Sequence, residues 1–203
     1  MRFCQLILPV VTLAYRPLHL AELRVLLGQE IPINKVQKAM EFCGSFLTVL
    51  DDYVYFVHQS VKDYLSGKAS SAIFPSGTHQ AHYDIYSPSI QALSSGPLRR
   101  NTYDIPHPGR LIDEIVRPHP DPLAAVRYSC IHWITHLCEG IANSSSAKHQ
   151  HELNDNGRVS RFLRLHFLHW LEASSFLRAM SDAVLSATRL ESLLRVSPVH
   201  YNM

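Results

Sequence analysis

The spacing of apolar residues along this sequence changes near residue 46 from a helical to a strand-like pattern. This change restricts the folds that the chain can adopt. Before residue 45, apolar residues recur every three or four positions, which is the spacing of helix faces. Residues 46–50 and 53–58 are rich in β-branched and aromatic side chains and flank Asp51-Asp52. This pattern predicts a β-hairpin with a two-residue turn, although Asp-Gly would suit such a turn better. A helical pattern then returns and stops at Gly67.

The helical stretch before the hairpin divides into three helices. Pro9 lies inside the first and is expected to kink it or to mark its true start. The second is closed by Gly28, and the third opens at Pro32 and ends before Gly44. Three helices, a hairpin and a closing helix form the order of a winged-helix domain. We therefore predict a winged-helix domain over residues 1–67.

The remaining sequence predicts further helices. Residues 68–120 are interpreted as a connector with one helix, kinked at Pro88, followed by an irregular link that holds five prolines. Asp121 is expected to cap a helix that runs to Cys138, and residues 140–156 to form a mobile loop. Two more amphipathic stretches follow, around residues 163–177 and 184–194. The predicted fold class is mainly α, with a helical domain over residues 121–203.

Composition and cysteine pattern narrow the class of protein. With 203 residues and 46% hydrophobic content, the chain can bury one large core or two small ones. A formal charge of +2 gives no reason for strong attraction to nucleic acid or to an anionic membrane. No apolar run approaches the ~20 residues of a membrane span. Cys4, Cys43, Cys130 and Cys138 form no Cys-x-x-Cys pair, so we expect reduced thiols and a cytoplasmic protein.

No motif of nucleotide hydrolysis or of other catalysis is found in the sequence. A phosphate loop ends in Gly-Lys-Ser/Thr, but the one Gly-Lys pair here, Gly67-Lys68, is followed by Ala69. The sequence also lacks a Gly-x-Ser-x-Gly elbow, a His-Glu-x-x-His zinc motif and a Gly-x-Gly-x-x-Gly loop. We therefore predict that this chain is not an enzyme and needs no cofactor.

Three groups of polar residues could be mistaken for sites. His132 and His136 have the i, i+4 spacing of a metal-binding pair, but they lie opposite the apolar stripe, so we expect them to face water. His166 and His169 are interpreted as a partly exposed helix edge, and no metal site is predicted. The Asp51-Asp52 carboxylates belong to a turn, where neighbouring side chains point apart.

Four segments together resemble one protein family. They are Val11–Leu18, Phe42–Thr48, Val54–Leu65 and Ile73–Gly77. In this order they resemble the region after the NACHT domain of fungal NLR-like proteins, which include vegetative (heterokaryon) incompatibility proteins. The first part also resembles the winged helix named after GPI inositol-deacylase, a name that implies no lipase chemistry here. The likeness continues through Asp121–Cys130 and from Phe162 to Leu194, and so covers nearly the whole chain.

The resemblance implies a function as part of a STAND-type switch. In such proteins ADP holds a closed state, ATP opens it, and oligomerisation passes on a signal. A winged-helix histidine similar in position to His58 reaches the bound ADP. The implied partners are a NACHT domain upstream and a repeat domain downstream. The chain departs from the family by lacking the NACHT domain, which places its own nucleotide-dependent activity in doubt.

Two readings of His58 and two other functions stay open at this point. His58 could instead be a corner residue that caps the next helix, with Ser60 nearby. A winged helix could also bind nucleic acid, but the candidate recognition helix, residues 33–43, carries Lys35 and Lys38 with an acidic Glu41, whereas specific binders usually show a basic stripe. An enzyme is disfavoured because no site was found.

Overall fold

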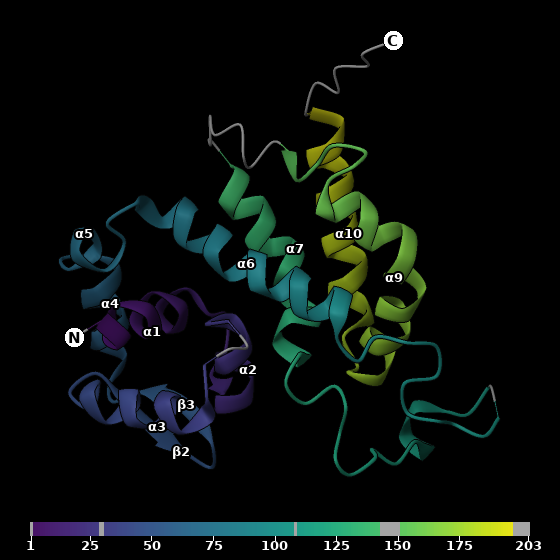
Figure 1. Ribbon diagram of the computed structural model, residues 1–203, viewed down its shortest axis with the longest axis horizontal. Coiled ribbons are helices and arrows are strands. Elements are labelled where there is room, and N and C mark those ends of the chain that lie inside the picture. Colours follow the sequence, from purple (N-terminus) through teal and green to yellow (C-terminus); the bar gives the residue numbers. More distant parts are fainter. Residues whose placement is uncertain (1, 29–30, 108, 143–150, 197–203) are drawn as a thin grey trace.

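The computed structural model describes residues 2–28, 31–107, 109–142 and 151–196, and these are mainly helical (Figure 1). We call residues 2–66 the N-terminal part; it contains α1 (Arg2–Leu13), β1 (Leu18–His19), α2 (Leu20–Leu26), α3 (Ile33–Phe42), β2 (Leu47–Leu50), β3 (Tyr53–Phe56) and α4 (Gln59–Ser66). We call residues 77–196 the C-terminal part; it contains α6 (Gly77–Ser95), the 3-10 turn η1 (Ile112–Glu114), α7 (Arg127–Ile141), α9 (Arg158–Phe176) and α10 (Met180–Val196). The short α5 (Ser70–Ile73) lies between them.

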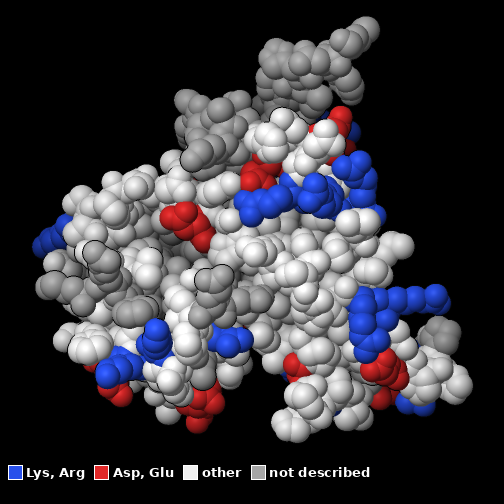
Figure 2. Space-filling model, in the orientation of Figure 1, with Lys and Arg blue, Asp and Glu red and all other residues white. Residues whose placement is uncertain are grey.

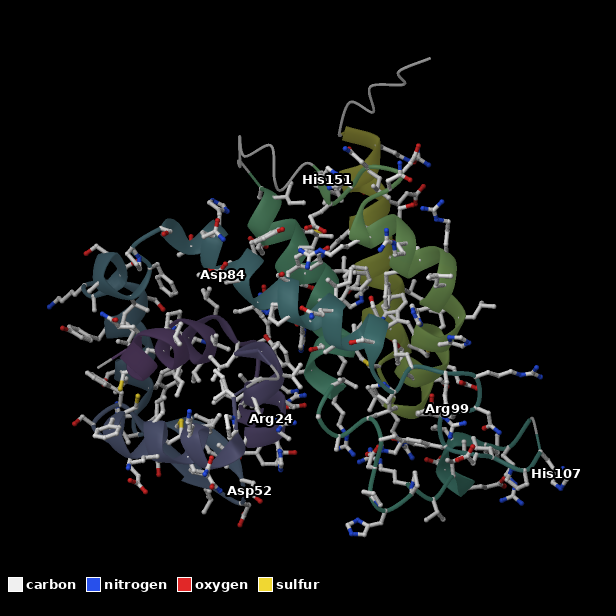
Figure 3. The ribbon with its side chains drawn as sticks, in the orientation of Figure 1. Arg24, Asp52, Asp84, Arg99, His107 and His151 are labelled. Atoms are coloured by element: carbon white, nitrogen blue, oxygen red, sulfur yellow. The ribbon has the colours of Figure 1, made fainter. Side chains whose placement is uncertain are left out.

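The predicted hairpin is confirmed. β2 pairs antiparallel with β3, and β1 pairs antiparallel with the other edge of β3, which gives the strand order β1-β3-β2. Asp51 and Asp52 form the turn with φ values of 50° and 63°, the left-handed pair that a type I′ hairpin requires. Asp52 stands at the outer tip of the hairpin (Figure 3), and its carbonyl accepts a hydrogen bond from Leu20 N at 2.8 Å.

Two hydrophobic clusters form the core, and they interlock. The first fills the N-terminal part, where Leu18, Leu23 and Leu65 are almost fully buried. The second fills the C-terminal part around Trp133 and Trp170. Ile85 of α6 and Tyr128 of α7 pack into the first cluster, while Val25 of α2 packs into the second. The two parts are therefore joined by buried side chains as well as by the chain.

The predicted helix in the connector is longer than expected. α6 begins at Gly77, where φ is 85°, and continues through Pro88 to Ser95. Its residues Ile90 and Leu93 are almost fully buried against the second cluster. The periodicity found the centre of this helix but missed its first turn, which carries few apolar side chains. The Pro-rich stretch after α6 is irregular, as predicted, apart from η1.

The next predicted helix starts later than expected. α7 begins at Arg127, not at Asp121, and it extends past Cys138 to Ile141. Asp121 does accept a hydrogen bond from Leu123 N at 2.8 Å, but this bond caps a turn. The same carboxylate accepts from Tyr103 Oη at 3.2 Å and from Arg127. These contacts fix the turn ahead of the helix.

The predicted loop at 140–156 is partly wrong. Residues 143–150 lie outside the described residues, but Glu152 is 6% exposed and binds to the rest of the protein. Its carboxylate accepts hydrogen bonds from Tyr83 Oη at 2.7 Å, from Tyr86 Oη at 2.9 Å and from Arg158 at 2.6–3.1 Å. These bonds hold the start of α9 against α6.

Within the described residues, no helix combines the length and the apolar character that crossing a membrane requires.

Candidate functional site at the corner between β3 and α4

His58 stands where the hairpin ends and α4 begins. β3 ends at Phe56, and Val57 N then donates to the carbonyl of Phe46 at 3.0 Å, which holds the end of the hairpin. His58 itself is extended, with φ −154° and ψ 149°, and α4 starts at the next residue. The histidine therefore occupies the N-cap position, and its side chain is exposed.

The cap bond decides which nitrogen of the ring faces outward. His58 Nδ1 accepts a hydrogen bond from Ser60 N at 3.2 Å and lies 2.8 Å from Ser60 Oγ. A nitrogen that accepts from a backbone N–H carries no proton, so the neutral ring carries its proton on Nε2. Nε2 makes no hydrogen bond to any described residue. The geometry thus combines a helix cap with an N–H donor that is open to solvent.

Polar groups border the surface next to this corner. Gln59 and Lys62 of α4 line a cavity of about 260 Å³ together with Tyr55 of β3 and Arg16. Lys62 Nζ lies 3.5 Å from the carbonyl of Ala14. Arg16 is paired with the carboxylate of Glu22, so Lys62 supplies the uncompensated positive charge of this cavity.

A buried carboxylate joins the N-terminal part to α7. Glu22 is 2% exposed, and its two oxygens accept from Arg16 Nη1 and Nη2 at 2.8 and 2.6 Å. It also accepts from His19 N at 2.9 Å and from Tyr128 N at 3.1 Å. Burial lowers the pKa of Arg16, but the hydrogen bonds and charge of Glu22 outweigh this and raise it. Glu22 thus has a partner for each oxygen at the junction of the two parts.

The prediction that His132 and His136 face water is wrong for His136, while His132 is half-buried. His136 is fully buried, and burial lowers its pKa to about 2, while burial lowers the pKa of His132 to about 4. The reason is that α7 is covered on two sides, so the face opposite its apolar stripe packs against α6 and Tyr15. No group of three metal-ligating side chains is found among the described residues.

His136 belongs to a hydrogen-bonded chain that crosses the same junction. Tyr15 N donates to Tyr128 Oη at 3.3 Å, and Tyr128 Oη lies 2.8 Å from His136 Nε2. His136 Nδ1 lies 2.8 Å from His82 Nδ1 on α6. Since Tyr128 can donate to Nε2, the proton of neutral His136 belongs on Nδ1, where it reaches His82. The bond between the two Nδ1 atoms requires one of them to be unprotonated, so the chain breaks when both histidines are charged.

The other sequence candidates lie apart from this region of the fold. His166 and His169 are half-buried on α9, as predicted, and neither Nδ1 has a hydrogen-bond partner among the described residues. Asp51 and Asp52 form the hairpin tip.

The four cysteines are free thiols, two of them buried. Cys4 Sγ lies 2.8 Å from Cys43 Sγ. Burial, followed by the contact with Cys4, raises the pKa of Cys43 to about 12.

Sequence reasoning missed the junction residues Arg16, Glu22 and Tyr128. Arg16 lies in a segment that carries the family resemblance, and Tyr128 lies inside a predicted helix with no signal of its own. One local signal existed, because His19 and Glu22 form a capping box. A capping box usually begins with Ser or Thr, so the sequence His19-x-x-Glu22 is not recognised as one from the pattern alone.

Comparison with known proteins gives one informative result. Over 207 aligned residues this chain is 41% identical to the vegetative incompatibility protein HET-E-1 of Podospora anserina. The chain is similar to a segment of a fungal incompatibility protein. The alignment covers 94% of this chain and 15% of HET-E-1, so the chain spans a small fraction of that relative. No family model matches the chain, and no solved structure gives a significant match.

Proposed function

We propose that this chain is a regulatory, non-catalytic segment of a NACHT-type signalling NTPase. The observation that carries the proposal is its 41% identity to HET-E-1 over 94% of the chain. In this proposal the nucleotide is bound by a separate NACHT domain, and a repeat domain follows. The segment acts through protein–protein contacts, without membrane or nucleic acid, and couples the nucleotide state to signalling.

We further propose that residues 1–67 are a winged-helix module. Two observations support this. The elements run helix, strand, helix, helix, strand, strand, helix, and the three strands form an antiparallel sheet in the order β1-β3-β2. This order is that of a helix-turn-helix core with a β-hairpin wing.

In the closed state, His58 would bind a phosphate oxygen of ADP. Its Nδ1 is engaged by Ser60, so the outward group is the Nε2–H donor, which suits a phosphate acceptor. Lys62 follows one turn later in α4 and adds positive potential. A hydrogen bond to a charged group contributes about 1.5–3 kcal/mol, and its loss shifts a closed–open balance by about ten- to a hundredfold.

The test uses a parent protein that contains the nucleotide-binding domain. His58→Ala removes both the cap and the outward donor, whereas His58→Asn keeps a good cap and removes the outward reach. We expect both variants to weaken ADP binding by about tenfold or more and to raise spontaneous signalling. If only His58→Ala does so, the histidine acts as a helix cap and the coupling role is wrong.

The non-catalytic assignment is tested on this chain by itself. We expect no turnover of ATP above a buffer blank, and no ATP binding by calorimetry that is tighter than the binding of pyrophosphate. Micromolar ATP binding that pyrophosphate does not compete away would contradict the proposal.

The alternative of a nucleic-acid-binding winged helix is tested with a gel shift on duplex DNA at low salt. Lys35, Lys38 and Glu41 are all exposed on α3, so both charge signs stand on the candidate recognition helix. Figure 2 shows separate patches of both signs over the N-terminal part on the face in view. We therefore expect no shifted band.

A further inference from the structure

A cavity of about 330 Å³ lies between the N-terminal part and the C-terminal part. The hairpin side contributes Tyr53 and Tyr55 of β3. The loop after α1 contributes Arg16, and the opposite wall is formed from Arg117 of the Pro-rich link and Arg127 at the start of α7. In Figure 1 the lower end of α7 faces α2, which places these walls at the junction. Its lining is completed by Pro17, Glu22, Ile131 and Leu177.

The charges of this cavity favour an anion. Three guanidinium groups line it, against the carboxylate of Glu22 and that of Asp121, which pairs with Arg127. Three cations and two carboxylates leave one positive charge. Both Glu22 oxygens already accept from Arg16 and from backbone N–H groups, so this carboxylate has little capacity left to attract a cation.

Two of the arginines have unused donors. Arg127 Nε is buried and has no hydrogen-bond partner among the described residues. Since Nε is itself shielded from solvent, the donor of Arg127 that can meet an acceptor in the cavity is Nη1, which makes no hydrogen bond to a described residue. Arg117 is exposed and makes no hydrogen bond or ion pair to a described residue. The unpaired donors thus come from the link and from α7, on the wall that faces β3.

We propose that this cavity binds a small anion of the phosphate class, held between the guanidinium groups of Arg117 and Arg127. A guanidinium presents planar paired donors that match phosphate oxygens, which a point charge such as lysine does not. Tyr53 and Tyr55 also line the cavity, and a tyrosine hydroxyl can donate to an anion. A bound anion therefore contacts both parts of the chain and strengthens the junction. His58 does not line this cavity, although Arg16 and Tyr55 border both it and the cavity beside α4. The anion site does not depend on the nucleotide role proposed for His58.

The experiment titrates the 203-residue chain with inorganic phosphate and with pyrophosphate at constant ionic strength. Binding is measured by calorimetry, and thermal unfolding is followed in parallel. The variants are Arg117→Gln, which changes an exposed side chain that makes no hydrogen bond or ion pair to a described residue, and Arg127→Lys, which keeps the charge opposite Asp121 but removes the planar guanidinium donors. The matched control is Arg161→Gln, an exposed arginine on α9 outside the cavity.

We expect saturable binding and a higher unfolding midpoint for the unmodified chain and for Arg161→Gln. Each cavity variant should weaken binding by about tenfold. The proposal is overturned if neither anion saturates, if Arg161→Gln weakens binding as much as Arg117→Gln, or if both cavity variants bind normally. Tighter binding of a hexaglutamate peptide than of pyrophosphate would also overturn it, in favour of an acidic protein partner.

Discussion

The Glu22 carboxylate on α2 accepts a hydrogen bond from the backbone N–H of Tyr128 in the first turn of α7, at 3.1 Å. The bond spans 106 positions of sequence. It places a negative charge at the positive end of the α7 dipole, while the Arg16 guanidinium balances that charge at 2.6 Å and lies 5.3 Å from the centre of the Tyr128 ring. This buried side chain therefore joins the two parts, together with the interlocking hydrophobic clusters.

Replacing this carboxylate should loosen the junction. Glu22→Gln leaves Arg16 without its counter-charge. It also replaces one acceptor oxygen by an NH2 group, which cannot accept from the N–H groups of Arg16, His19 or Tyr128. We expect the free energy of unfolding to fall by about 2 kcal/mol. This loss is smaller than the loss for breaking a fully buried ion pair, because the Arg16 side chain is 32% exposed and can be hydrated. Urea denaturation measures this. Glu41→Gln, on an exposed position of α3, is the control and should change stability little; equal losses in the two variants would contradict the assignment.

Stability should fall as the pH drops below about 6.5. The folded pKa values of His132 and His136, about 4 and about 2, lie below the ordinary value of 6.5. The unfolded chain therefore binds protons that the folded chain does not. Between pH 6.5 and 4, each histidine can remove up to about 1.4 kcal/mol per pH unit from the free energy of unfolding. Above pH 6.5 both states are neutral and the effect vanishes.

The slope of stability against pH is the measurement that isolates this effect. His136→Asn should flatten the slope between pH 6.5 and 4, even though it also lowers stability at neutral pH. His119→Asn, at an exposed position of the link, should leave the slope unchanged. An unchanged slope in His136→Asn would mean that other groups cause the acid sensitivity.

Two residues with left-handed backbone conformation, Gly28 and Asp52, should respond to substitution with stability changes of opposite sign. Gly28 has φ 96°, and a Cβ atom there would meet nothing within 4 Å. Gly28→Ala should therefore cost about 1 kcal/mol through conformation alone. Asp52 has φ 63° in the hairpin turn, where glycine is preferred. Asp52→Gly should raise the free energy of unfolding by about 0.5 kcal/mol. Thermal unfolding of both variants checks the signs, and two changes of the same sign would contradict these turn conformations.

Local patterns predicted the N-terminal elements well because their boundaries are set locally. Gly28 and the Asp51-Asp52 turn each fix an end through a left-handed backbone conformation. The start of α7 could not be found this way, since Asp121 is held by Arg127 and Tyr103 as well as by the turn that it caps. Such contacts depend on packing that no window of sequence contains.

In the candidate site, too, contacts between neighbours in sequence could be predicted and contacts between distant residues could not. His58 and Ser60 are two residues apart, so the cap was foreseeable as one of two readings. The junction of Arg16, Glu22 and Tyr128 joins positions more than 100 residues apart, and no periodicity links them. The burial of His136 was missed because a helical wheel shows one apolar stripe and cannot show that a second face is covered by α6.

The stability of the isolated chain separates the two roles of His58. As an N-cap, its Nδ1 satisfies the backbone N–H of Ser60, so His58→Ala should lower the free energy of unfolding by about 1 kcal/mol. Asparagine is among the best N-cap residues, so His58→Asn should stay within about 0.5 kcal/mol of the unmodified chain. Urea denaturation of the two variants measures the cap by itself, with no nucleotide present. If His58→Asn lost as much as His58→Ala, the ring would contribute contacts beyond the cap, and a change of ADP affinity in a parent protein could no longer be assigned to Nε2.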